Sequence, residues 1–183
     1  MACRLVPRCA LVLVAAACAP ALRPSVPASD VPGLVGTWRA VEYWDRGSAD
    51  VPKGFPYGKR PCGYVIYTST GHVSVQLAAG PVPPRLPADS VRDGVPMDAA
   101  ETLSMLRRNI SYFGTYTVDS TRGMVVHNIE AEAGRTITDT HAARPFRLRG
   151  DTLILGNELT WRRLLVREMP GGGPNSACAQ RTR

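Results

Sequence analysis

The chain has 183 residues, of which 44% are hydrophobic and 20% are charged, and its formal net charge is +7. This length favours one domain with its own core, and the hydrophobic fraction excludes a chain that is disordered throughout. Lys53 and Lys59 are the only lysines in the sequence, so the positive charge is almost entirely arginine. The 17 glycines and 16 prolines are spread along the chain, which favours turns and short strands over long helices.

The first residues have the pattern of a secretory signal peptide. Arg4 and Arg8 precede an apolar run over residues 10–17 that ends in small residues. A transmembrane helix needs about 20 apolar residues, so this run is too short to span a bilayer. We expect residues 1–17 to be removed, which lowers the net charge to +5 because this segment holds two arginines and no acidic residue.

The sequence Ala15-Ala16-Ala17-Cys18 resembles the lipobox of bacterial lipoproteins, with Ala15 where leucine is usual. The resemblance implies lipidation of Cys18, secretion across the inner membrane, and a lipid-anchored protein in the cell envelope that faces the periplasm. The alternative is ordinary cleavage after small residues, with Cys18 incidental. Residues 18–33 are rich in proline and alanine and are expected to form a tether.

Two cysteines remain in the body of the chain, Cys62 and Cys178. An even number of cysteines in an oxidising compartment favours a disulfide between them. The alternative is a pair of free thiols. A separation of 116 residues argues against a metal site built from this pair alone.

The body of the chain consists of eight candidate strands separated by turn residues. The last three follow one another so closely that antiparallel hairpins must connect them. A run of this kind with little helix predicts an all-β barrel or sandwich. The candidates are Thr37–Trp44, Tyr64–Thr68, His72–Leu77, Tyr112–Asp119, Met124–Glu132, Arg144–Arg149, Thr152–Gly156 and Glu158–Arg167.

One helix is expected after a proline-rich loop at residues 81–97. Asp98 and Glu101 have the spacing of a capping box. Leu103, Leu106 and Ile110 then recur at helical spacing and form one apolar face. The helix and loop together are positioned to cap one mouth of a barrel, and residues 169–183 are expected to be a flexible tail.

Several of these segments resemble the lipocalin-like domain family of small bacterial proteins. The matching blocks are Gly36-Thr37-Trp38-Arg39, Tyr67 with residues 71–76, Tyr112–Asp119, residues 126–130 and the closing hairpins up to Arg163. The resemblance covers about residues 34–167 and implies a domain at 34–168. The implied fold is an antiparallel up-and-down β-barrel of about eight strands with one inserted helix. It also implies an internal cavity for a small apolar molecule, and a floor in which Trp38 packs under an arginine, here Arg163.

Side-chain alternation along the strands selects the interior residues. His127 lies on an otherwise apolar face, and Arg144 is in register with Phe146 and Leu148. Trp38 is expected to share a face with Ala40, Glu42 and Trp44. The ligand-binding candidates are Trp38, Tyr67, Tyr116, His127 and Arg144. Alternatively, the histidine and the aromatic residues are core residues that stabilise the fold and bind no ligand.

These features favour a protein that binds a small apolar or amphipathic molecule, without a cofactor and without an assigned catalytic residue. One alternative is a barrel enzyme of isomerase or cyclase type that uses His127 with Tyr116. Another is a structural envelope module whose barrel is filled by side chains. His72, His127 and His141 have none of the spacings of a metal motif, so no metal is expected. The clustered arginines are typical of a solvated face near a membrane surface, and no nucleic-acid partner is expected.

Overall fold

The computed structural model describes residues 31, 33–47, 54–80, 99–133, 140–173, 175 and 178. The predicted signal peptide, Cys18, most of the tether and the proline-rich loop lie outside these residues.

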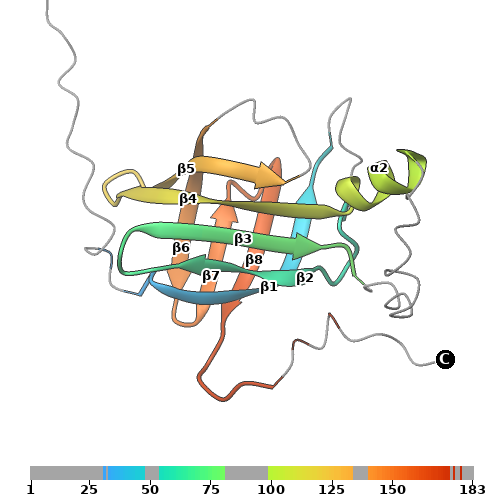
Figure 1. The fold of residues 1–183 in the computed structure, drawn as a ribbon. Helices are drawn as coiled ribbons and strands as arrows, with labels where there is room; N and C mark the ends of the chain where they lie inside the picture. Colours follow the sequence, from blue (N-terminus) through green and yellow to red (C-terminus); the bar gives the residue numbers. More distant parts are fainter. Residues whose placement is uncertain are drawn as a thin grey trace, which may run out of the picture.

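Eight antiparallel strands form a closed barrel in which each strand pairs with its neighbours in the sequence and β8 pairs with β1 (Figure 1). The predicted fold class is therefore confirmed, and each of the eight candidate strands corresponds to an observed one. The strands are β1 Gly36–Asp45, β2 Cys62–Tyr67, β3 His72–Ala78, β4 Asn109–Asp119, β5 Met124–Ala133, β6 His141–Arg149, β7 Thr152–Gly156 and β8 Trp161–Arg167.

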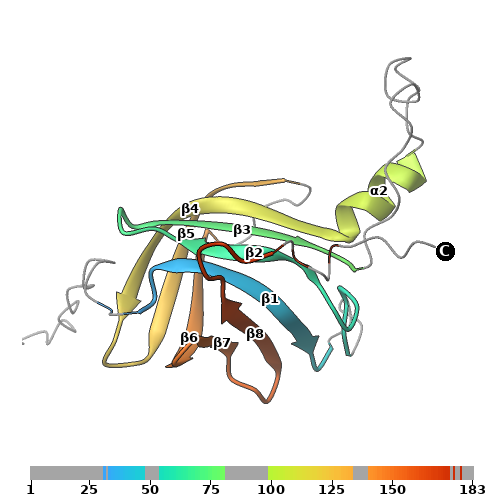
Figure 2. The same ribbon diagram turned by 90° about the horizontal axis from the view of Figure 1, so that it is seen from below.

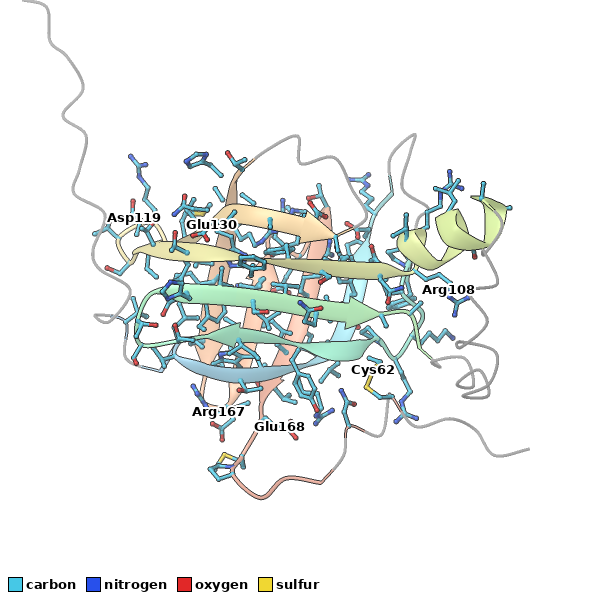
Figure 3. The ribbon with its side chains drawn as sticks, viewed as in Figure 1. Cys62, Arg108, Asp119, Glu130, Arg167 and Glu168 are labelled. Carbon is cyan, nitrogen blue, oxygen red and sulfur yellow. A yellow bond between two sulfur atoms is a disulfide. The ribbon has the colours of Figure 1, made fainter. Side chains whose placement is uncertain are left out.

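The two ends of the barrel are named here after residues that Figure 3 labels. At the Asp119 end, β4 turns tightly into β5, and the short turn from β2 to β3 lies beside it. At the Cys62 end, β1 ends, β2 begins, and α2 (Ala99–Arg107) leads into β4. Tight hairpins therefore close the Asp119 end, whereas the longer connections of the chain leave from the Cys62 end.

Apolar side chains fill the Asp119 end of the interior. Six fully buried residues make up its centre: Leu34, Trp38, Val73, Val118, Val125 and Leu153. The Trp38 indole donates a hydrogen bond of 2.8 Å from Nε1 to the carbonyl oxygen of Leu34. This end of the barrel is a packed core.

The arginine over Trp38 is Arg167, and the expectation that Arg163 holds this place is wrong. The Arg167 guanidinium lies 4.2 Å from the centre of the Trp38 ring and donates a hydrogen bond of 2.9 Å to the carbonyl oxygen of Val35. The reason is strand register, because Trp38 pairs with Arg167 across β1 and β8, whereas Arg163 pairs with Tyr43. Such a cation–π contact contributes about 1 kcal/mol.

Gly36 makes this packing possible. Its φ angle is 150°, in a region that side-chain-bearing residues rarely adopt, and a Cβ atom there would collide with the Arg167 guanidinium. The glycine that opens β1 therefore leaves the space into which Arg167 reaches.

The observed helix differs from the expected one. α2 ends at Arg107, and Ile110 lies buried in β4 instead of extending the helical face. Leu103 and Leu106 are 46% and 37% exposed, because α2 packs mainly against the start of β4 and projects away from the barrel (Figures 1 and 2). The expected N-cap Asp98 lies outside the described residues. No described helix is long and apolar enough to cross a membrane.

A disulfide joins Cys62, at the start of β2, to Cys178 in the segment after β8. It fastens that segment to the Cys62 end of the barrel (Figure 3). Of the two alternatives that the sequence leaves open, the structure contains the bonded pair.

Candidate functional site

A cavity of about 190 Å³ occupies the interior toward the Cys62 end. A single water needs roughly 10–15 Å³ by the same kind of measure, so this space is large enough for a small organic molecule. Every strand contributes to the wall. The lining residues are Ala40, Glu42, Tyr43, Asp45, Val65, Val75, Leu77, Ile110, Tyr112, His127, Arg144, Leu155, Trp161, Arg163 and Leu165.

A bulge in β1 determines which residues of that strand line the cavity. The register with β8 shifts between Ala40 and Glu42, which brings Tyr43 and Asp45 into the wall. Simple alternation predicts Trp44 at this position instead, and that expectation is wrong, although Glu42, which alternation also places inside, does line the cavity. A bulge inserts one extra residue into a strand and so exchanges the inner and outer faces that follow it.

His127 is the centre of a buried hydrogen-bond network. Its Nε2 atom lies 2.7 Å from the Tyr67 hydroxyl oxygen, and its Nδ1 atom lies 2.8 Å from the Tyr112 hydroxyl oxygen. Tyr67 ends β2 and reaches the imidazole from the filled half of the barrel, whereas Tyr112 lines the cavity. The imidazole therefore stands between the packed core and the cavity.

Burial sets the protonation states of this network. Burial, and then the positive charge of Arg144, lowers the pKa of the His127 imidazole well below its usual value. Burial also raises the pKa of the Tyr67 phenol well above its usual value and raises the pKa of the Tyr112 phenol. At neutral pH the imidazole and both phenols are uncharged.

Arg144 brings a positive charge to this neutral network. Its Nη2 atom donates a hydrogen bond of 3.0 Å to the Tyr112 hydroxyl oxygen, and both side chains line the cavity. The other charges in the wall are paired: Arg163 lies 3.1 Å from Asp45, and Glu42 lies 2.6 Å from Arg162. Within the described part of the chain, no carboxylate lies within ion-pair distance of Arg144.

The opposite side of the wall is aromatic. The Arg163 guanidinium lies 3.2 Å from the centre of the Tyr43 ring and 4.9 Å from that of Trp161. Tyr43 also meets Tyr57 edge to face, with ring centres 4.7 Å apart. Arg163 therefore holds two cavity-lining rings in place.

The five predicted ligand-binding residues separate into three groups. His127 and Arg144 line the cavity. Tyr67 contacts His127 from the core side, and Tyr116 lies beside Tyr67 and donates a hydrogen bond to the carbonyl oxygen of Thr68. Trp38 is buried in the core at the Asp119 end, so the prediction that it lines the cavity is wrong.

Three aromatic residues of the cavity wall are absent from the candidates chosen from the sequence: Tyr43, Tyr112 and Trp161. Tyr112 shares an alternating face with Tyr116, and that pattern was its available signal. The sequence contains no signal for Tyr43, because the residue pattern does not reveal the bulge that turns this side chain inward. Among the described residues, no three histidine, cysteine, aspartate or glutamate side chains are grouped so as to hold a metal ion.

Residues 35–165 match the family model of the lipocalin-like domain. No curated protein has significant sequence similarity to the chain. The matched region spans all eight strands up to Leu165 in β8, and so includes nearly the whole barrel and its cavity. With most of its length covered by this domain, the chain belongs to the lipocalin-like domain family.

Proposed function

We propose that this protein binds a small amphipathic molecule in the cavity at the Cys62 end of its barrel. The observation that carries the proposal is a cavity of about 190 Å³ whose wall is mainly apolar. Its polar groups are those of His127, Tyr112 and Arg144, together with the ion-paired side chains of Glu42, Asp45 and Arg163. Ligand sites typically combine an apolar enclosure with a small number of fixed polar groups that orient the bound molecule.

The two alternative functions fit the interior less well. A barrel filled by side chains would leave no such cavity between the described residues. An acid–base enzyme needs a ring nitrogen that reaches the substrate, and both nitrogens of His127 are bonded to tyrosine hydroxyls. These contacts favour a role for the imidazole in positioning Tyr112.

Binding can be tested with Nile red, an uncharged dye that fluoresces in apolar surroundings. The full chain carrying Cys18→Ser, which removes the proposed lipidation site, is titrated with the dye. Val75→Phe places a larger side chain in the cavity wall, and Gln76→Phe places the same side chain on the exposed outer face of the same strand. We expect Val75→Phe to weaken dye binding about ten-fold or more and Gln76→Phe to leave it unchanged. Equal binding by all three proteins would contradict the proposal.

We also propose that the protein is exported and anchored in the cell envelope through Cys18. The pattern of residues 1–18 supports export, and so does the Cys62–Cys178 disulfide, because such bonds persist mainly in oxidising compartments. In cell fractionation, Cys18→Ser is expected to move the protein from the membrane to the soluble fraction. Unaltered membrane association would refute the anchor.

A further inference from the structure

We propose that the Arg144–Tyr112 pair forms an acceptor-binding subsite that selects a ligand with an acidic head group, such as a carboxylate. The inference rests on the proposed binding function and specifies the chemistry of its ligand. Two independent observations lead to it: the count of hydrogens in the His127 network, and the charge balance of the cavity wall.

The three side chains of the network, His127, Tyr67 and Tyr112, hold three hydrogen-bond donors. A neutral imidazole carries one N–H, and each tyrosine carries one O–H, whereas the network contains only two links, Tyr67–His127 and His127–Tyr112. One hydrogen is therefore left over in either tautomer. If Nε2 carries the proton, the spare hydrogen belongs to Tyr67; if Nδ1 carries it, the spare hydrogen belongs to Tyr112.

Burial decides between the two tautomers. Tyr67 is 1% exposed and does not line the cavity, and no second hydrogen-bond partner of its hydroxyl is found among the described residues. A spare hydrogen there would be buried without an acceptor, which is costly. On Tyr112 the spare hydrogen faces the cavity. We therefore assign the proton to Nδ1 of His127, with Tyr67 donating to Nε2.

In this tautomer the Tyr112 oxygen accepts hydrogen bonds from both His127 and Arg144. Its acceptor capacity is used, so its own O–H can only donate. Arg144 has five N–H donors, and its bond to Tyr112 uses one of them. The subsite thus presents a fixed hydroxyl donor and a guanidinium, and it lacks a free acceptor.

The charge balance points to the same class of ligand. Asp45 and Glu42 are each paired with an arginine, so Arg144 supplies the uncompensated charge of the described wall. A guanidinium bonds a carboxylate with two roughly parallel hydrogen bonds, and charged bonds are stronger than neutral ones. An alcohol would satisfy fewer of these donors, and an ammonium group would be repelled. The apolar part of the ligand would lie against Val65, Val75 and Leu155.

The test compares octanoate, octan-1-ol and octylamine, which each have eight carbons in a straight chain and differ in the head group. Each displaces Nile red from the Cys18→Ser protein at pH 7.5. We expect octanoate to bind about ten-fold or more tightly than octan-1-ol and octylamine to bind most weakly. If octan-1-ol or octylamine equals or exceeds octanoate, the acid subsite is overturned while the binding function stands. If the protein binds neither the dye nor any of the three compounds, both are overturned.

Substitutions test whether Arg144 and Tyr112 cause the preference for octanoate. Arg144→Met should reduce the advantage of octanoate over octan-1-ol to about two-fold or less, while the binding of octan-1-ol itself is retained. Arg149→Met, on the exposed face of the same strand, should preserve the advantage of octanoate. Tyr112→Phe should weaken octanoate binding, and Tyr64→Phe, at a β2 position outside the cavity wall, should not. An octanoate preference that survives Arg144→Met would overturn the assignment to this residue.

Discussion

His127 and Tyr112 are joined by a hydrogen bond of 2.8 Å between Nδ1 of the imidazole and the phenolic oxygen. This bond connects a side chain at the border of the core with one in the cavity wall. Its direction determines whether Tyr112 offers a donor to a ligand. The ring tautomer of His127 therefore determines whether Tyr112 can donate to a ligand in the proposed subsite.

The tautomer can be observed directly. We predict that Nδ1 of His127 carries the proton and that Nε2 does not, because only this arrangement gives the buried Tyr67 hydroxyl an acceptor. Nitrogen-15 NMR separates the protonated from the unprotonated ring nitrogen, and the chain has only three histidines. A proton found on Nε2 would return the spare hydrogen to Tyr67 and remove the donor assigned to Tyr112.

The buried imidazole also predicts how stability depends on pH. The pKa of His127 is lower in the folded state than the value of about 6.5 expected in the unfolded state, so between the two values only the unfolded chain binds the proton. The stabilising effect of the neutral ring is fully present above about pH 6.5. The free energy of unfolding then falls as the pH drops, by up to about 1.4 kcal/mol per pH unit.

Urea denaturation between pH 4.5 and 7.5 measures this dependence. His127→Gln should flatten the profile, and His72→Gln should not, since His72 is exposed. The neighbours of His127 in the network are Tyr67, Tyr112 and Arg144, none of which titrates in this range. A slope that persists in His127→Gln would assign the effect to other groups.

Arg167 is expected to stabilise the floor of the barrel. Arg167→Met removes the guanidinium stacked on Trp38 and leaves the carbonyl oxygen of Val35 without this donor. The expected loss is about 2 kcal/mol in the free energy of unfolding, because the contact lies against fully buried residues. The ion pair with the exposed Asp151 adds little. Arg149→Met is the matched control, and equal urea midpoints for the two variants would contradict this role.

Local patterns were sufficient to predict the strands. Turn residues such as Gly71, Gly123 and Gly150 mark the hairpins, and period-two alternation places His127 and Arg144 inside. These signals concern neighbours in the sequence, which is why the order of elements and the barrel class could be predicted.

Contacts across the barrel could not be predicted in the same way. Arg163 and Arg167 lie on one face of β8, so alternation cannot decide which of them meets Trp38; the register between β8 and β1 decides it. The bulge after Ala40 likewise changes the face of β1 without a residue that signals it. The bond from His127 to Tyr67 joins β5 to β2, which are not neighbours in the sheet, so it depends on the curvature of the barrel.

The end of the helix could not be predicted from the sequence for a different reason. Helical spacing extends through Ile110, but that residue pairs with Leu77 of β3, and barrel pairing therefore ends the helix at Arg107. Pairing between β3 and β4 gives Ile110 hydrogen bonds and burial that a continued helix at this position would lose.

Binding of a small amphipathic acid inside the barrel is the basis of these proposals. It is tested most directly by mapping NMR chemical-shift changes while the full chain carrying Cys18→Ser is titrated with octanoate. We predict saturable shifts at cavity residues, foremost Val75, Tyr112 and Arg144, and unchanged signals at the outward-facing Gln76 and Phe113. Shifts confined to the outer face, or no saturable shifts at all, would contradict it.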